Sequence, residues 1–234
     1  MPLRRRPRPS SGRTAATLGL SLGLCLFAVG CLLATETWPP EPDTSGWSIA
    51  LEDSFGDPLS GFADDRYAHG RWFYESGRYG IEVTKQDWLM WSTHTITFTD
   101  FAIEVDVVSE ASTGSAGVVF RAGEGGYQYH TFRISPAGEY TLERALGKEG
   151  EDMRWETILP WRSSSHIVAG SGTNRVKVVC IDVDMWLYVN DQYLAAASDE
   201  GLAIGEIGMV VGNSADESAV FYFDDLAVYV PPEE

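Results

Sequence analysis

The sequence predicts an all-β protein built as an antiparallel sandwich or jelly roll. Apolar and polar residues alternate in many short segments, most clearly over 101–107, where Glu104 and Asp106 face away from the apolar residues. Turn sequences such as 124–126 separate nearly every pair of segments. The chain contains 24 Gly, 8 Trp, 10 Tyr and 10 Phe, a composition that favours strands and turns over a helical bundle.

The first 30 residues have the composition of a secretory signal. Residues 1–14 are basic, and residues 15–34 carry no charge. The stretch AVGC at 28–31 resembles the lipobox of bacterial lipoproteins, with alanine in place of the usual leucine. This resemblance implies cleavage before Cys31, which would then carry the lipid. The alternative is an uncleaved signal anchor, and both place the rest of the chain outside the cytoplasm.

A Pro-rich, acidic tether is expected over residues 31–47, followed by one folded domain over residues 48–230. A domain of this size buries roughly 70% of its unfolded surface, so it needs no disulfide. Strands are predicted within the domain at residues 48–55, 79–84, 88–91, 101–107, 115–121, 127–135, 139–145, 154–159, 175–182, 185–189, 193–197, 205–211 and 219–230.

Charge excludes one class of partner. Five of the 17 basic residues lie within the first 13 positions, which leaves 12 basic and 34 acidic residues, a net charge of −22, after residue 30. A domain this acidic is not expected to bind nucleic acid, or to contact an anionic membrane except through the lipid anchor.

The last predicted strand carries a phase slip. Its apolar residues change face at Asp224-Asp225, which predicts a β-bulge. Two adjacent carboxylates there, with Asp53 of the first strand, could hold a structural Ca²⁺ through oxygen ligands, and no other cofactor is expected. The alternative is an edge strand that charge protects from pairing with another chain.

The histidine and cysteine residues of the domain do not indicate a metal site or a reactive thiol. None of the 4 histidines has a metal-ligand spacing, and His130 shares the apolar phase of its strand, so we expect it to be hydrogen-bonded inside the domain. Cys180 is in phase with Val178 and is expected to be a core thiol. Asn190-Asp191 between two strands predicts a type I′ hairpin.

Seven short motifs follow one another along the domain: EDSF and SGF, then GVVFR and FRISPAGEY, and finally TNRV, LYVN and FDDL. In this order they resemble bacterial extracytoplasmic concanavalin A-like domains, which are laminin-G-like and related to the 3-keto-disaccharide hydrolase family, and the resemblance covers about residues 48–230. The resemblance implies a jelly roll that binds sugars or proteins. One departure is Asp191, where the family usually has glycine.

One predicted strand and the residues after it carry three carboxylates, Glu104, Asp106 and Glu110. Their spacing resembles that of the catalytic carboxylates in retaining glucanases of this fold class, which is E-x-D-x-E or E-x-D-x-x-E. Here the third carboxylate is one residue further away. At about 3.3 Å per residue, Glu104 and Glu110 would lie roughly 20 Å apart, too far for a retaining pair. We therefore interpret these carboxylates as the solvent face of an alternating strand.

Aromatic and arginine residues on the non-core phase of three strands form the predicted ligand-binding face. Sugar rings stack their C–H faces on aromatic rings, and their hydroxyls bind forked donors and acceptors. The predicted residues are Tyr127, Tyr129, Trp186, Tyr188, Arg121 and Arg133. The alternative is that these rings only stabilise cross-strand pairs.

These observations predict a lipid-anchored, non-catalytic module at the extracytoplasmic face of the cell membrane. Its expected partner is a carbohydrate or another cell-envelope polymer. Two alternatives are a glycoside hydrolase or lyase of the keto-sugar type, which would use acid/base carboxylates such as Glu104 and Asp106, and a structural protein–protein module. Whether the chain is an enzyme stays open at this point, with binding favoured over catalysis.

Overall fold

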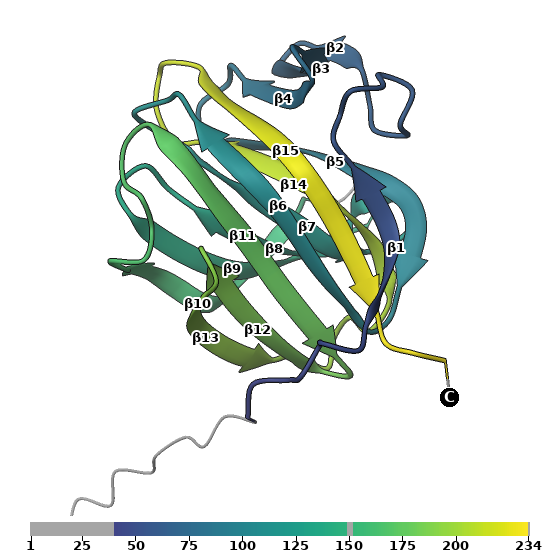
Figure 1. Ribbon diagram of the computed structural model, residues 1–234. Helices are drawn as coiled ribbons and strands as arrows, with labels where there is room; N and C mark the ends of the chain where they lie inside the picture. The colour runs from purple at the N-terminus through teal and green to yellow at the C-terminus, as the bar shows by residue number, and fades with distance from the viewer. Residues whose placement is uncertain (1–39, 149–151, 234) are drawn as a thin grey trace, which may run out of the picture. The chain divides into compact units, whose positions relative to one another are not determined.

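The computed structural model describes residues 40–148 and 152–233, which form two antiparallel sheets facing each other (Figure 1). The predicted all-β sandwich is confirmed, and the one helix in the described residues is the 3-10 turn η1 (Glu124–Gly126). Nothing in this part of the chain is a helix long and apolar enough to cross a membrane. The predicted signal sequence, Cys31 and most of the tether lie outside the described residues.

The larger sheet has nine strands. Its order is β13 (Gln192–Ser198), β12 (Asp184–Val189), β11 (Gly172–Ile181), β6 (Phe101–Ser109), β15 (Ala219–Val230), β4 (Arg78–Val83), β3 (Gly70–Glu75) and β2 (Asp65–Tyr67). The remaining strand, β1 (Ser48–Asp53), pairs with the second half of β15, whereas β4 pairs with the first half. The long strand β15 therefore joins the first strand of the domain to the β2–β4 region.

The smaller sheet has six strands, which run in the order β10 (Arg154–Ser163), β9 (Glu139–Leu146), β8 (Gln128–Ile134), β7 (Ser115–Ala122), β14 (Gly205–Asn213) and β5 (Trp88–Phe98). Strand β14 is inserted between β5 and β7 although it lies about a hundred residues further along the chain. Such long-range pairing explains why the order of strands in each sheet cannot be deduced from local alternation.

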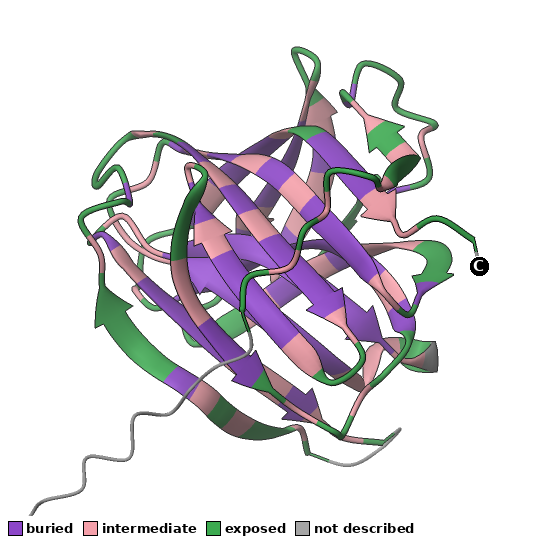
Figure 2. Ribbon diagram, turned by 60° about the horizontal axis from the view of Figure 1, so that its bottom comes forward, coloured by how far each residue is buried: buried purple, intermediate pink, exposed green. Residues whose placement is uncertain are grey.

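The main hydrophobic core fills the space between the two sheets. Phe101 and Ile103 of β6, and Phe120 and Phe132 of the smaller sheet, are fully buried there. Figure 2 shows buried segments along the middle of the strands and exposed segments in the loops that connect them. Cys180 lies in this core as predicted, and burial raises the pKa of its thiol to about 12, so it is inert.

Two strands, β2 and β3, were not predicted, and β5 is longer than the predicted 88–91. Strands β3 and β4 are joined by Ser76 (φ 55°) and Gly77 (φ 76°), a tight turn with positive φ at both central residues. The Ser-Gly pair was the available signal for this hairpin. The exposed strand β2 has no apolar alternation to reveal it.

Two local predictions are confirmed by backbone geometry. Asn190 (φ 53°) and Asp191 (φ 60°) join β12 and β13 with the positive φ values of a type I′ turn. Strand β15 bulges between Asp224 and Ala227, where Asp225 has φ 45°. Because of this bulge, apolar residues on both sides of it face the same core.

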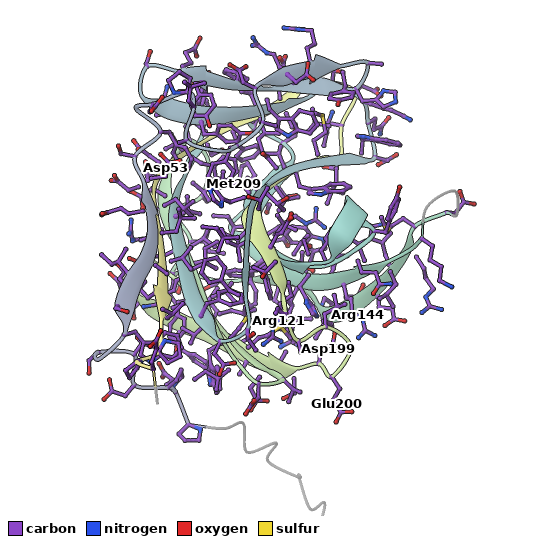
Figure 3. The ribbon with its side chains drawn as sticks, turned by 90° about the vertical axis from the view of Figure 1, so that its right-hand side faces the viewer. Asp53, Arg121, Arg144, Asp199, Glu200 and Met209 are labelled. Atoms are coloured by element: carbon purple, nitrogen blue, oxygen red, sulfur yellow. The ribbon has the colours of Figure 1, made fainter. Side chains whose placement is uncertain are left out.

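A buried polar cluster closes one end of the sandwich (Figure 3). His130 is buried as predicted, and its Nε2 lies 2.8 Å from Oδ2 of Asp199, which also pairs with Arg144. Desolvation lowers the pKa of His130 more than its bond to Asp199 raises it, so the buried ring is neutral near pH 7. Arg121 is also fully buried there and donates to the carbonyls of Leu202 and Asp182.

Candidate binding face of the six-stranded sheet

The outer face of the six-stranded sheet carries a second, smaller apolar cluster. Val119 of β7 and Val210 of β14 lie beneath Trp91 and Tyr129 in this cluster. The ring of Tyr129 is 4.7 Å from that of Trp91 and 5.8 Å from that of Trp155 on β10. These three rings pack against one another in a row across the outer face of the sheet.

Arg133 of β8 lies beside this row, where a glycine makes room for it. A side chain at Gly212 of β14 would place its Cβ 2.7 Å from Nη1 of Arg133. That Nη1 donates to Oγ of Ser115 at 2.9 Å, and Nη2 pairs with Glu143 on β9. The guanidinium is therefore fixed on the sheet by neighbours on three strands.

A cleft of about 540 Å³ opens next to Arg133. The guanidinium carbon of Arg133 lies 5.6 Å from the ring centroid of Trp161, whose side chain is 42% exposed. The other lining residues come from the ends of four strands and the adjoining loops: Asp87, Leu89, Ser112, Thr113, Gly114, Ser115, Ser135, Pro136, Ala137, Glu139, Gly212, Asn213 and Ser214. The cleft thus joins an accessible indole, a forked donor and several hydroxyls.

Asn213 anchors the loop that forms one wall of this cleft. Its Nδ2 donates to the carbonyls of Val83 and Glu217, and its Oδ1 accepts the N–H of Ala215. Oγ of Ser135, by contrast, is buried and has no hydrogen-bond partner. The wall is therefore held by bonds within the protein, while Ser135 keeps an unused donor and acceptor.

The predicted binding residues do not share one face. Tyr127, Tyr129 and Arg133 belong to the six-stranded sheet or the loop before β8, whereas Trp186 and Tyr188 lie on β12 of the nine-stranded sheet. The rings of Tyr129, Trp186 and Tyr188 do point away from the main core, as the alternation predicted. The expectation of a single face is wrong because alternation identifies a side of a strand and not the sheet that the strand joins.

Tyr129 and Arg121 are not available to a ligand in this structure. Tyr129 is fully buried in the aromatic row, and desolvation raises the pKa of its hydroxyl. Arg121, predicted on the outer phase, instead reaches across to the carbonyl of Asp182 on the opposite sheet. Its φ of 50° lies at a register shift between β7 and β14, and this irregularity reverses the alternation at that position.

Trp186 and Tyr188 are covered by the segment that leads into the domain. Trp186 is only 4% exposed and packs in a cluster with Ala102, Val179 and Trp47, the last residue before β1. The hydroxyl of Tyr188 is hydrogen-bonded to the carboxylate of Glu41. The part of the nine-stranded sheet around these two rings is thus covered by the chain itself, whereas a hollow of about 500 Å³ beside Arg175 stays open.

Glu104 and Asp106 also lie on the outer face of the nine-stranded sheet, where both form ion pairs with Arg175. Its two terminal nitrogens donate to Glu104 at 2.8 Å and to Asp106 at 2.9 Å. Burial opposes the charged form of Glu104, but the bonds and charge of Arg175, with Lys177 and Tyr229, outweigh it and lower the pKa. Glu110 pairs instead with Arg78. A carboxylate held ionised, as Glu104 is, is poorly suited to act as a general acid.

Of the three aspartates predicted to bind calcium, Asp53 and Asp225 line one hollow, and Asp224 does not line it. Within 40–148 and 152–233, no group of three or more His, Cys, Asp or Glu side chains could hold a metal ion. Oδ1 of Asp53 accepts the N–H of Phe55, and Oδ1 of Asp224 accepts the N–H of Asp225. One oxygen of each of these two carboxylates thus serves a local turn, while Oδ2 of Asp53 is buried without a partner, and the calcium site stays a prediction.

Solved structures with the same arrangement of strands identify the fold. The carbohydrate-binding module CBM66 from Bacillus subtilis is 13% identical and superposes with a TM-score of 0.54 over 79% of this chain and 96% of its own. A protein of unknown function with a galectin-like fold, also from Bacillus subtilis, is 12% identical with a TM-score of 0.54 over 80% and 100%. The fold is a concanavalin A-like jelly roll.

A third concanavalin A-like structure, SCLam, is described as a non-specific endo-β-1,3(4)-glucanase from family GH16. It is 10% identical and superposes with a TM-score of 0.51 over 83% of this chain and 95% of its own. No model of a protein family matches the chain, and neither does the sequence of any curated protein. At these identities the likeness establishes the fold, and the function must be argued from the site.

The strongest cleft residue, Trp161, was missed from the sequence. The predicted strand stopped at residue 159, before Pro160, whereas β10 continues to Ser163. Proline is tolerated because β10 is an edge strand of its sheet. The signal that could have revealed this region is the density of tryptophan, because Trp155 and Trp161 lie on the same strand.

Proposed function

We propose that this chain is a membrane-anchored, extracytoplasmic and non-catalytic module that binds a neutral polysaccharide in the cleft around Arg133 and Trp161. The observation that carries the proposal is the pairing, in one cleft, of an indole that is 42% exposed with a guanidinium held 5.6 Å from its ring centroid. Proteins of the same fold include a carbohydrate-binding module and a glucanase, which supports this ligand class.

The cleft chemistry matches a sugar ring. The apolar C–H face of the ring would stack on Trp161, and its hydroxyls would accept hydrogen bonds from Arg133 and exchange them with the serines of the cleft wall. Hydroxyls both donate and accept, so they also suit Ser135, whose Oγ has no partner.

The charge of the site favours an uncharged ligand. Asp87 and Glu139 line the cleft together with Arg133, and the chain after residue 30 carries 34 acidic against 12 basic residues. An anionic polysaccharide would be repelled by the acidic surface around the cleft. A neutral glucan or galactan meets no such penalty.

A glycan array probed with the full-length chain in detergent tests the proposal. Binding to neutral glycans is expected, and Trp161→Ala should weaken it about tenfold, as loss of a stacking ring predicts. Trp155→Ala is the matched control, because this ring on the same strand is 38% exposed and does not line the cleft. No binding, or equal loss in both variants, would contradict the proposal.

The hydrolase alternative is tested on the same glycans by release of reducing ends. Asp87 and Glu139 are the carboxylates that line the cleft, and a glycosidase requires two such groups. Under the binding proposal, no reducing ends are released. Release that disappears in Glu139→Gln would establish catalysis and overturn the non-catalytic part of the proposal.

The anchoring part of the proposal rests on the AVGC stretch before Cys31. Palmitate labelling of the expressed chain should be lost in Cys31→Ser. Cys25→Ser is the matched control, because Cys25 is a nearby cysteine in the same apolar run with Leu24 immediately before it. Labelling that persists unchanged in Cys31→Ser would favour the uncleaved signal anchor instead.

A further inference from the structure

A second hollow, of about 380 Å³, lies beside the cleft. We call it the aromatic pocket, and its lining residues are Tyr67, His69, Trp72, Trp88, Leu89, Met90 and Trp91. They come from the unpredicted strands β2 and β3, the turn between them and the start of β5. Nearly the whole lining is apolar or aromatic, in contrast to the hydroxyl-rich cleft.

The rings of this pocket hold one another in place while part of their surface stays open. Tyr67 packs edge to face on Trp72 at 5.2 Å, and His69 packs on Trp88 at 4.7 Å. Nζ of Lys85 lies 3.8 Å from the ring centroid of Trp88. Tyr67 is nevertheless 61% exposed and Trp88 39% exposed. Rings fixed in this way lose little freedom when a ligand stacks on them.

The pocket wall also contains an unsatisfied donor. Nε1 of Trp72 is buried and has no hydrogen-bond partner. A buried N–H without an acceptor is unfavourable and calls for a specific explanation. A ligand that brings an oxygen atom together with an apolar ring face would fit this wall better than a purely hydrocarbon ligand.

The aromatic pocket is continuous with the cleft. Leu89 lines both hollows, and the two residues before it, Asp87 and Trp88, line the cleft and the pocket respectively. The two hollows therefore meet at Leu89, on the edge strand β5 of the six-stranded sheet. A chain molecule seated in the cleft would continue past Leu89 into the aromatic pocket.

We infer that the aromatic pocket is a second sugar-binding subsite, which holds the residue next to the one bound at Trp161. This inference rests on the proposed function, and it makes the ligand a neutral oligosaccharide of several residues rather than a single sugar. The cleft supplies the polar contacts, and the pocket supplies stacking surface. Affinity should consequently depend on the length of the ligand.

Calorimetric titration of the full-length chain in detergent tests this dependence. The probes are size ladders, from one to six residues, of β-1,3-glucan, β-1,4-glucan and β-1,4-galactan. Affinity for the bound series should rise about tenfold or more from the monosaccharide to the hexamer. Trp88→Ala should lower the affinity for the hexamer three- to tenfold and leave that for the monosaccharide unchanged, while Trp161→Ala should weaken both.

Trp155→Ala is again the control, since its exposed fraction of 38% matches the 39% of Trp88 and it lines neither hollow. Thermal unfolding should show that all three variants are folded. If Trp88→Ala keeps the full length dependence while Trp161→Ala loses affinity, the subsite is wrong and the proposed function stands. If no ladder binds, the proposed function itself is contradicted. If light scattering shows that Trp88→Ala converts an oligomer to a monomer without loss of affinity, the pocket is a contact between copies.

Discussion

The two outer faces of this sandwich carry the same kinds of residue and use them differently. On the nine-stranded sheet, Trp186 is buried against Trp47, and Arg175 is held between two carboxylates. On the six-stranded sheet, Trp161 stays 42% exposed and Arg133 borders an open cleft. Aromatic rings and arginines therefore identify a binding face only when no other part of the chain covers them.

What differs between the faces is the source of the covering groups. The segment before β1 supplies Trp47 and Glu41 to the nine-stranded sheet. On the six-stranded sheet the Trp91–Tyr129–Trp155 row of the sheet's own side chains lies directly on the strands. The segment before β1 therefore covers the rings of the nine-stranded sheet, while a hollow beside Arg175 on this face and the cleft beside Arg133 on the other face stay open.

The largest expected effect comes from exchanging tryptophan for alanine on each face. Trp186→Ala should lower the free energy of unfolding by about 3–5 kcal/mol, because it removes a buried ring and leaves a cavity. Trp161→Ala should cost less than about 1 kcal/mol and act on affinity instead. Urea unfolding monitored by circular dichroism measures both. Equal losses of stability would break the distinction between the faces.

The arginines provide the second test. Arg133→Met leaves the carboxylate of Glu143 unpaired in a mostly buried site, so a loss of about 2–3 kcal/mol is expected, together with weaker glycan binding. Arg175→Met should cost about 1–2 kcal/mol, because its pairs with Glu104 and Asp106 are more exposed. Glycan affinity should be unchanged in Arg175→Met, and a change would show that the covered face takes part in binding.

Removing the ring of Trp47, which covers Trp186, tests the covering of the nine-stranded sheet and should have a smaller effect on stability. Trp47→Ala should lower the free energy of unfolding by about 1 kcal/mol, because the ring is only partly buried on Trp186. Quenching of tryptophan fluorescence by acrylamide should increase as Trp186 becomes accessible. A fully stable variant with unchanged quenching would mean that residues before β1 do not cover this sheet in solution.

The smallest expected effect is a change in the pH dependence of stability, which belongs to the interior and to neither outer face. His130 has a pKa below its usual value in the folded state, so its contribution to stability is present above about pH 6.5 and lost as the pH falls through the folded value. The free energy of unfolding should therefore fall more steeply between pH 7 and pH 5 in the natural chain than in His130→Gln. Exposed His166→Gln is the control and should keep the natural slope.

Some of the candidate site was predictable and some was not. Arg133 was chosen from its phase on β8, and the structure does place it on the outer face at a cleft. Trp161 and Trp88 were not chosen, because a proline ended one predicted strand early and the unpredicted strands β2 and β3 supply much of the aromatic pocket. The local alternation of residues shows which side of a strand faces the core, but a pocket is formed by segments that are distant in the chain.

Local chemistry by itself determined most of the strands, several turns and the bulge of this protein. Positive φ at Asn190 and Asp191 and the slip at Asp224-Asp225 follow from neighbouring residues alone, as does the inward phase of Cys180. Only the tertiary structure decided that β8 and β12 belong to different sheets and that Arg121 turns inward. The physical reason is that alternation is a property of one strand, whereas sheet membership and exposure depend on long-range pairing and on what packs above each face.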